Sequence, residues 1–192
     1  LLPLSDDFEA PGNIGNGRKW GIIMETTLPM DWLGLVNSRL DIKTRWQDSS
    51  VTDPVTGEKR VLSATQIGFG GPPAVRFRDN GTEYIFDIAF RQDLDDARIA
   101  WGWDIAAQAE RPRFKVNELE IFDEGLEVNV FVESTRWFGV KLRVEGRNIL
   151  NYNEVRDRTL YDGRRDLSII SSRILRQRTP GSRILITLSG NF

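Results

Sequence analysis

The sequence contains neither cysteine nor histidine among its 192 residues. Without cysteine the chain has no disulfide, no thiol nucleophile and no thiolate ligand for a metal. Without histidine it also lacks the commonest general base and the commonest metal ligand of proteins. The sequence has no run of 18 apolar residues, so it predicts no transmembrane helix. These absences favour a scaffold or a binding protein over an enzyme.

The charge balance argues against a nucleic-acid-binding protein. The chain has 26 basic and 28 acidic residues and a formal net charge of −2, and its isoelectric point is near 5.4. Domains that bind nucleic acid usually carry a basic face that raises the isoelectric point well above this value. A length of 192 residues fits a single domain.

Catalytic motifs are also missing from the sequence. It contains no G-x-S-x-G nucleophile elbow and no phosphate-binding loop, and we interpret Gly68-Phe-Gly-Gly71 as a turn. Paired carboxylates occur at Asp95–Asp96 and at Glu118 with Glu120, and two carboxylates are enough for a glycosidase. We expect the first pair in a tight turn and the second in a loop, so neither predicts a catalytic pair. The sequence therefore predicts no enzyme, and no catalytic, cofactor-binding or metal-binding residues.

Alternation of apolar and polar residues with a period of two is the main pattern of the chain. It begins with Trp20, Ile22, Met24 and Leu28 on one side of an extended segment. The alternating segments are residues 18–28, 40–47, 83–91, 98–108, 126–133, 140–145 and 183–192. The sequence therefore predicts an all-β fold, an antiparallel up-and-down meander of about seven or eight long strands with very little helix.

The connections between these segments alternate between short and long. The short ones are Pro29–Asn37, Asp93–Asp96 and Ser134–Phe138, and the long ones are residues 1–17, 48–81, 110–124 and 146–182. Short periplasmic turns that alternate with long extracellular loops are typical of a transmembrane β-barrel. We therefore expect the strands to be part of such a barrel, with 1–17, 48–81 and 146–182 as extracellular loops. Aromatic residues near the short turns are expected in the periplasmic girdle, and they are Trp32, Phe90, Trp137 and Phe138.

The polar positions of the predicted strands carry charges of both signs, and we expect them to line the interior of the barrel. They are Asp41, Lys43, Arg45, Glu83, Asp87, Arg91, Arg98, Asp104, Glu127, Glu133, Lys141, Arg143 and Glu145. Opposite charges on neighbouring strands contribute about 0.2–1 kcal/mol for each pair. These residues predict an ion-paired wall.

The last long connection is rich in arginine. Its arginines are Arg156, Arg158, Arg164, Arg165, Arg173, Arg176 and Arg178. Such a cluster is suited to attract an anionic ligand, and the candidate binding residues are Arg156, Arg158, Arg173 and Arg176. Asp157, Asp162 and Asp166 lie among them and offset part of the positive charge.

Four stretches of the chain carry a resemblance to a known family. They are Asn13-Ile-Gly-Asn-Gly-Arg-Lys-Trp-Gly21, Trp46-Gln-Asp-Ser-Ser-Val-Thr-Asp-Pro-Val-Thr-Gly57, Val144-Glu-Gly-Arg-Asn-Ile-Leu-Asn-Tyr152 and Leu188-Ser-Gly-Asn-Phe192. By their order and position they resemble the C-terminal part of a TonB-dependent outer-membrane receptor, a 22-stranded transport barrel filled by an N-terminal plug. The third stretch is similar to a segment of that family's penultimate strand, with Asn148 and Tyr152 in the matching positions.

The resemblance implies energised uptake of a scarce nutrient, such as a ferric siderophore, through the bacterial outer membrane. The partners it implies are the lipid of that membrane, the protein's own plug domain, the TonB energy-transducing complex and the barrel-assembly machinery. Phe192 resembles the terminal aromatic residue read by that machinery, although Gly190 stands where the family usually has a bulky apolar residue. The plug has no counterpart in residues 1–192, so we expect them to be the C-terminal β-barrel segment of a longer protein.

Two alternatives remain open from the residues alone. A small, self-contained outer-membrane β-barrel, acting as a channel or an adhesin, requires an even number of strands. One of two doubtful strands, around Arg60–Ala64 or through Phe114–Phe122, would then have to span the membrane. A soluble β-sandwich or calycin-like binding module requires the apolar faces of residues 40–46 and 84–88 to pack against each other.

Overall fold

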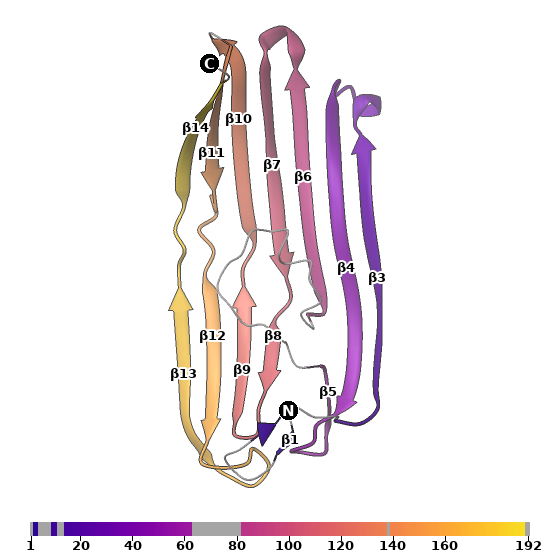
Figure 1. Cartoon of the computed structure of the whole chain (residues 1–192), viewed down its shortest axis with the longest axis vertical. Coiled ribbons are helices and arrows are strands. Elements are labelled where there is room, and N and C mark those ends of the chain that lie inside the picture. The colour runs from indigo at the N-terminus through magenta and orange to yellow at the C-terminus, as the bar shows by residue number, and fades with distance from the viewer. Residues whose placement is uncertain (1, 4–8, 11–13, 63–81, 138, 191–192) are drawn as a thin grey trace.

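The computed structural model describes residues 2–3, 9–10, 14–62, 82–137 and 139–190, and they form the predicted all-β, antiparallel up-and-down fold (Figure 1). Seven long strands form the main sheet, in the spatial order β14-β11-β10-β7-β6-β4-β3. They are β3 (Gly17–Pro29), β4 (Ser38–Thr52), β6 (Tyr84–Leu94), β7 (Ile99–Gln108), β10 (Glu127–Trp137), β11 (Val140–Arg147) and β14 (Arg183–Ser189). The short strand β5 (Lys59–Arg60) pairs with the end of β4 and is the eighth strand of this sheet.

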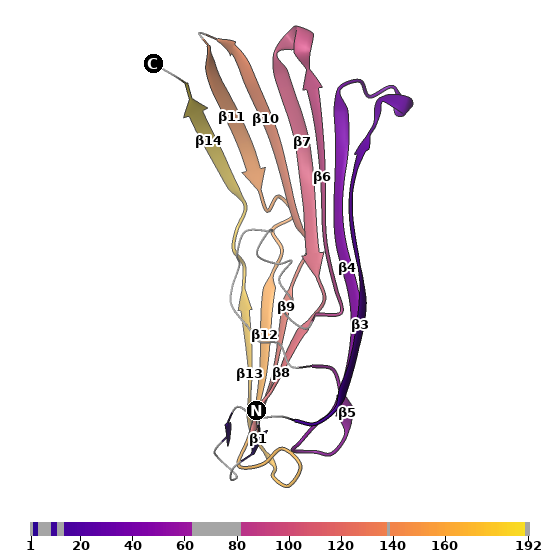
Figure 2. The same cartoon turned by 45° about the vertical axis from the view of Figure 1, so that its right-hand side comes forward.

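A second, distal sheet continues the main sheet at one end. Its strands are β8 (Arg111–Phe114), β9 (Glu118–Glu124), β12 (Glu154–Tyr161) and β13 (Ile170–Arg178). Figures 1 and 2 show β8, β9, β12 and β13 in line with β7, β10, β11 and β14, so four stretches of chain run from one sheet into the other. Two further short strands, β1 (Leu2–Pro3) and β2 (Glu9–Ala10), pair with each other.

The short connections of the main sheet lie at the end away from the distal sheet (Figure 1). Residues 30–37 join β3 to β4 through the 3-10 turn η1 (Asp31–Leu33), and residues 95–98 join β6 to β7 through η2 (Asp95–Ala97). β10 and β11 are separated only by residues 138–139. No helix of the described residues is long and apolar enough to span a membrane.

Two of the predicted long loops are largely strand. Segment 146–182 contains β12 and β13, and segment 110–124 contains β8 and β9 around a turn at residues 115–117. β8 and β9 lie where a strand through Phe114–Phe122 was left open, and in β9 Glu118 and Glu120 alternate with Leu119 and Ile121. β12 and β13 were not expected, and in β12 Arg156 and Asp157 place charge on both faces, so the apolar alternation that marks a strand is missing there. Segment 48–81 begins with the end of β4 and includes β5, and its residues from 63 to 81 lie outside the described residues.

The remaining predicted loop, 1–17, is only partly described. The described part contains β1, β2 and the first residue of β3. The position of all these segments outside a membrane stays a prediction, as does the assembly role of Phe192, which lies outside the described residues.

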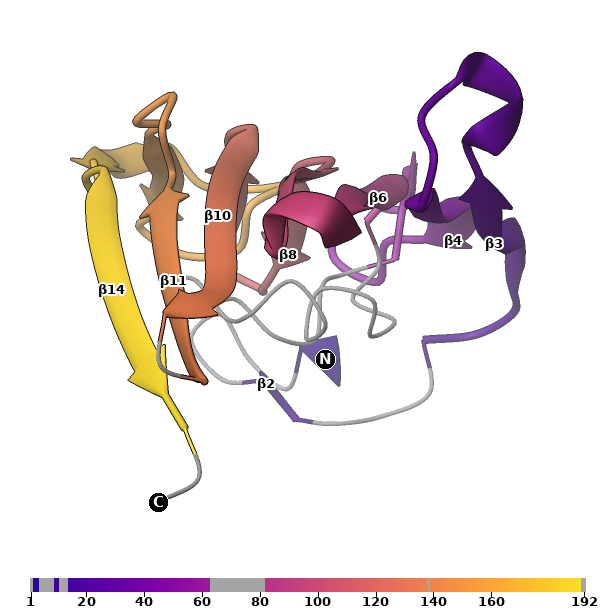
Figure 3. The ribbon, with the colours of Figure 1, turned by 90° about the horizontal axis from the view of Figure 1, so that it is seen from above.

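The register of the main sheet sorts its side chains into an apolar face and a polar face. Leu40 of β4 lies opposite Phe90 of β6, and Phe90 lies opposite Trp103 of β7. On the other face, Lys43 of β4 lies opposite Asp87 of β6. Because successive residues of a strand point to opposite sides, a shared register gathers the apolar residues of all seven strands on one face. Seen along the strands, the main sheet is a single layer that ends at β14 and β3 (Figure 3).

The aromatic residues near the short turns differ in their exposure. Trp32 and Trp137 are 76% and 53% exposed. Phe90 is instead buried, and its ring centroid lies 5.2 Å from that of Trp101 and 5.9 Å from that of Trp103. Its predicted place in an exposed girdle is wrong because the register packs it against these two indole rings. Phe138 lies outside the described residues.

A glycine on β7 makes room for an aromatic ring on the polar face. Gly102 lies directly opposite Phe131 of β10. A Cβ atom at Gly102 would lie 2.7 Å from Cε1 of Phe131 and 2.1 Å from the backbone oxygen of Phe90. Both distances are well inside van der Waals contact, so glycine alone fits here without movement of its neighbours.

We expect Gly102→Ala to lower the free energy of unfolding by about 1–3 kcal/mol, because the added methyl group displaces the Phe131 ring and the β6 backbone. Gly17→Ala is the matched control, since a Cβ there meets its neighbours only at 3.4 Å or more. The measurement is the urea midpoint followed by tryptophan fluorescence. Equal midpoints for the two variants would contradict the close contact at Gly102.

Candidate functional site

A set of ion pairs centred on Glu133 of β10 lies on the polar face of the main sheet. The Glu133 carboxylate is 2.6 Å from Nη2 of Arg91 on β6. It is 2.9 Å from Nζ of Lys141 and 3.1 Å from Nη1 of Arg143, both on β11. Glu133 is buried, and three cations compensate for the loss of its hydration. The predicted pairing of opposite charges across strands is confirmed at this position.

Small residues on β7 allow this network to cross from β6 to β10. Arg91 lies opposite Gly102, and Glu133 lies opposite Ala100, so β7 places no long side chain between them. The guanidinium carbon of Arg143 lies 3.9 Å from the ring centroid of Phe131, and that of Arg91 lies 5.8 Å from it. A cation over an aromatic face is attracted by the ring quadrupole, so Phe131 helps to fix both arginines.

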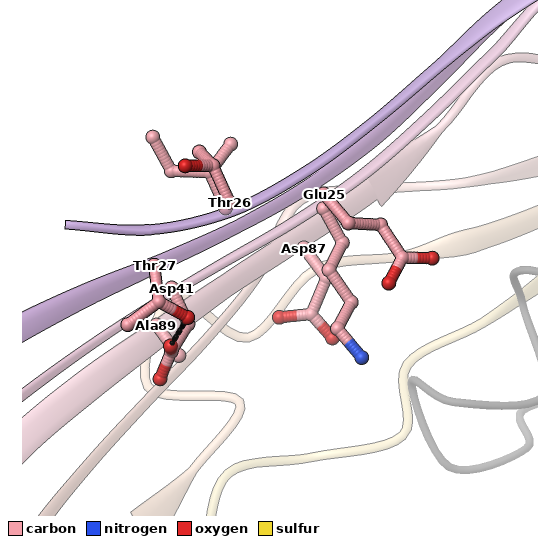
Figure 4. A pocket seen from close by; sticks show the side chains of 8 residues that line it. Glu25, Thr26, Thr27, Asp41, Asp87 and Ala89 are labelled. Carbon is pink, nitrogen blue, oxygen red and sulfur yellow. Dashed lines mark hydrogen bonds between the residues drawn. The ribbon is translucent and has the colours of Figure 1, made fainter.

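A shallow hollow of about 610 Å³ lies on strands β3, β4 and β6 (Figure 4). Glu25, Lys43 and Asp87 form one row across these strands, because Glu25 lies opposite Lys43 and Lys43 opposite Asp87. The hydroxyl of Thr27 donates a hydrogen bond of 2.6 Å to Asp41. The charged side chains that line the hollow are thus three carboxylates and one ammonium group, which gives it an excess of negative charge.

The four predicted ligand-binding arginines lie on the distal sheet but do not share one face. Arg156 of β12 lies directly opposite Arg176 of β13, and Arg158 is two residues further along β12, so these three point to one side. Arg173 points to the opposite side, where its Nε donates a hydrogen bond of 3.0 Å to Asp157. The structure therefore brings together three of the four predicted arginines.

Carboxylates of β9 neutralise two of these arginines. Glu118 and Glu120, predicted to lie in a loop, are buried residues of strand β9. Arg158 donates a hydrogen bond of 2.7 Å to Glu118, and Arg156 donates one to Glu120. Burial alone would raise the pKa of Glu118, but the hydrogen bonds from Arg158 and Lys115 outweigh it and lower that pKa. Binding of an anionic ligand by the arginines stays a prediction, and much of their charge is compensated within the sheet.

A buried carboxylate ties together three connections at the distal end of the molecule. Asp53 follows β4, and its Oδ2 accepts hydrogen bonds from Nε of Arg60 at 2.6 Å and from Nη2 of Arg165 at 2.7 Å. Arg165 comes from the connection between β12 and β13. Its Nε also donates a hydrogen bond of 2.6 Å to the backbone oxygen of Lys115, in the turn between β8 and β9. We call Asp53, Arg60 and Arg165 the Asp53 clasp.

The sequence contains only part of the information that specifies the clasp. Asp53 begins a turn, and its Oδ1 accepts a hydrogen bond of 2.8 Å from the backbone amide of Val55, which is the usual use of Asp in turns. Arg165 lies 112 residues later in the chain. No periodic pattern relates the two positions, so the sequence does not indicate that they meet.

Asn148, matched by the family resemblance, is a buried residue of the break between β11 and β12. Its backbone is left-handed, with φ of 51°, a conformation that asparagine adopts more readily than most residues. Its Oδ1 accepts a hydrogen bond of 3.1 Å from the backbone amide of Tyr152. Its carbonyl oxygen accepts one of 2.7 Å from the hydroxyl of Ser182, just before β14. Asn148 therefore fixes the bend between the two sheets, and this role is structural.

Acidic residues are frequent in the chain, but their arrangement gives no metal site in the part of the chain that the structure describes. No group of three or more acidic side chains there is placed to hold a metal ion. The chain matches no protein-family model, and no curated protein or solved structure is significantly similar to it.

We expect Asp53→Asn to lower the free energy of unfolding by about 3 kcal/mol near neutral pH, because it leaves two nearly buried guanidinium groups without their carboxylate. Burial alone would raise the pKa of Asp53, but hydrogen bonds from Arg165, Val55 and Arg60 lower it below 3.8. A carboxyl group with a lowered pKa in the folded state contributes stability above its unfolded pKa. That contribution is lost as the pH falls through the folded pKa.

The urea midpoints of the parent chain and Asp53→Asn, measured from about pH 7 to about pH 2, should therefore converge at the acid end. Asp96→Asn is the control, since Asp96 is an exposed turn residue and its change should cost less than about 0.5 kcal/mol. A difference in midpoint between the parent chain and Asp53→Asn that stays constant down to the lowest pH would refute this role of Asp53.

Proposed function

We propose that this chain forms the C-terminal part of the barrel wall of a TonB-dependent outer-membrane receptor. Such a receptor takes up a scarce nutrient, such as a ferric siderophore, through the bacterial outer membrane. The observation that carries the proposal is the two-faced main sheet, which is apolar and exposed on one side and charged on the other. In a transmembrane barrel the outer face meets lipid and the inner face lines a polar lumen.

The apolar face is exposed over a height that matches a lipid bilayer. Its exposed side chains include Ile22, Met24, Leu28, Trp46, Trp101, Val130, Val132, Val144, Ile184, Ile186 and Leu188. On β6 the positions of this face run from Tyr84 to Leu94, and all except Gln92 are apolar. At about 3.3 Å per residue this strand is about 33 Å long. A tilt of about 40° reduces its height to about 25 Å, which is the height of the lipid-facing band of known barrels.

Aromatic side chains lie at both ends of the apolar face. Near the distal sheet, Trp46 lies opposite Tyr84, and Trp20 lies on the neighbouring strand β3. At the other end, Trp32 and Trp137 lie in or beside the short turns and are more than half exposed. Tryptophan and tyrosine are enriched where a membrane meets water, so their position at both ends supports the proposed orientation.

The directions of the two edge strands indicate that a closed barrel wall would contain more strands than the seven of the main sheet. Seven antiparallel strands leave the two edge strands, β3 and β14, pointing in the same direction. They therefore cannot pair antiparallel with each other, and a closed antiparallel wall needs an odd number of further strands. Within the described residues the doubtful strands do not supply one, because β5 has two residues and β8 and β9 extend β7 and β10. Residues 63–64 of the first doubtful strand lie outside the described residues. A receptor barrel of 22 strands meets this requirement.

The observed register argues against the soluble sandwich. That alternative requires the apolar faces of residues 40–46 and 84–88 to pack against each other from two layers. In the structure these segments are neighbouring strands of one sheet, and Ile42 lies directly opposite Ile88. Side chains that stand side by side on one face do not form the facing layers of a sandwich, so this register favours the barrel wall over the sandwich.

Under the proposal, the polar faces of the two sheets form one surface of the lumen. The amide of Gln108 on β7 donates a hydrogen bond to Glu124 on β9, so the polar face continues from the main sheet into the distal sheet. Arg156, Arg158 and Arg176 lie on this side, where an anionic cargo would meet them. The plug domain would pack against the same surface and connect it to the TonB complex.

An antibody against residues 183–192 tests the size and location of the native protein. We expect a band several times heavier than 21.9 kDa in the outer-membrane fraction of the source cell. A band near 21.9 kDa in that fraction would favour the small, self-contained barrel instead. The same mass in the soluble fraction would exclude both membrane proposals.

Cysteine substitution at two neighbouring isoleucines of β3 tests which face of the main sheet meets lipid. Ile22 lies on the apolar face and Ile23 on the polar face, yet they are 65% and 67% exposed in this structure. The chain has no cysteine, so Ile22→Cys and Ile23→Cys each create a single thiol in it. In outer-membrane vesicles we expect a water-soluble maleimide to label the thiol of Ile23→Cys about tenfold faster than the thiol of Ile22→Cys. Lipid around position 22 keeps water away and disfavours the thiolate form, which is the form that reacts. Equal rates, as the equal exposures predict without a membrane, would refute a lipid-facing apolar side.

A further inference from the structure

At the distal end, two parts of the chain lie side by side without a shared backbone ladder. β6 begins at Tyr84, opposite Trp46, so β4 runs on to Thr52 without this neighbour. Figures 1 and 2 show this extension of β4, together with β5, beside the distal sheet. In the part of the chain that the structure describes, β5 pairs only with β4, and β8 pairs only with β9. We call the boundary between β4–β5 and β8 the seam.

A hollow of about 640 Å³ lies on the seam. Asp48 of β4 lines it from one side, and Pro112 of β8 and Asp123 of β9 line it from the other. Glu83 and Glu110 contribute two more carboxylates, and the described residues that line the hollow include no cation. Charges that share one hollow repel each other, because salt at 0.1 M screens them only beyond about 10 Å. At this level the charges therefore favour separation of the two parts.

Arginine contacts hold the seam closed nearer the tip of the distal sheet. Nη2 of Arg165, in the β12–β13 connection, lies 2.7 Å from Asp53, which follows β4. The guanidinium carbon of Arg60 on β5 lies 4.2 Å from the ring centroid of Phe114 on β8. Arg164 donates a hydrogen bond of 3.2 Å to a backbone oxygen of the β4–β5 turn. The side chains of Asp53 and Arg165 are more than nine-tenths buried, so salt screens their attraction little.

We propose that the Asp53 clasp is a latch, which holds the seam closed against the repulsion of its carboxylates. When the latch is released, β8 and the β4–β5 extension move apart. Opening breaks side-chain contacts but no backbone ladder of the described residues, so the two arrangements differ little in secondary structure. The open seam gives access from the side to the polar face at the distal end. The inference concerns two parts of one chain, so it holds whether or not the chain lies in a membrane.

A pair of spin labels across the seam tests the proposal. The chain has no cysteine, so Glu58→Cys in the β4–β5 turn and Ile169→Cys in the β12–β13 connection give two unique, exposed labelling sites. Double electron–electron resonance on the 192-residue chain in neutral detergent micelles measures the distance between the labels. We expect one narrow distance distribution in the parent and a second, longer population in Asp53→Asn or Arg165→Gln. An unchanged distribution in both variants would overturn the proposal.

Two controls separate release of the latch from local unfolding. Asp96→Asn, in the turn at the other end of the main sheet, should leave the seam distance unchanged. Labels at Arg18→Cys and Glu58→Cys both lie on the β3–β4–β5 side of the seam, so Asp53→Asn should not alter their distance. A longer population in either control would assign the effect to general loosening and would contradict the latch.

Removal of a seam carboxylate tests the opposing force. In the Asp53→Asn background, Asp123→Asn should reduce the ratio of open to closed molecules about twofold, because one repelling charge is lost from the hollow. Asp96→Asn in the same background is the matched control and should leave that ratio unchanged. An equal ratio with and without Asp123→Asn would show that the carboxylates of the hollow do not drive the seam apart.

Discussion

The antiparallel register of the main sheet is the constraint on which the rest of the structure depends. A slip of one residue in any strand pair would move all side chains of that strand to the opposite face. In the observed register, the indole of Trp103 packs on Phe90 on one face. On the other face the same register places Arg91 and Arg143 within reach of Glu133. The exposed apolar face and the buried ion pairs are therefore two results of one set of backbone hydrogen bonds.

The main strands could be predicted from the sequence because only one of their faces is apolar. β4, for example, alternates Leu40 and Ile42 with Asp41 and Lys43, and this contrast is what a period of two detects. The strands of segment 146–182 could not be predicted in the same way. In β12 the neighbours Arg156 and Asp157 point to opposite faces and are both charged, so the two faces do not differ in polarity.

The part of the candidate site that lies on the alternating strands of the main sheet could be predicted from the sequence. Glu133 and its cations were expected on one polar face, and they pair there because neighbouring strands bring them together. The positive charge of the arginine-rich segment was overestimated, because Glu118 and Glu120 reach it from β9 and not from nearby in sequence. The Asp53 clasp depends on Arg165, which lies 112 residues away, and local patterns carry no information about such a contact.

The up-and-down strand order also defines a route of assembly for the sheet. Most neighbouring strands in space are neighbours in the chain, and β14 reaches β11 once the β12–β13 hairpin has returned the chain. Pairings between chain neighbours close short loops and lose little entropy. A single hairpin is only marginally stable, so each new strand gains stability by adding to the edge of those already formed. The sheet can therefore grow by templated addition, in which every finished edge guides the register of the next strand.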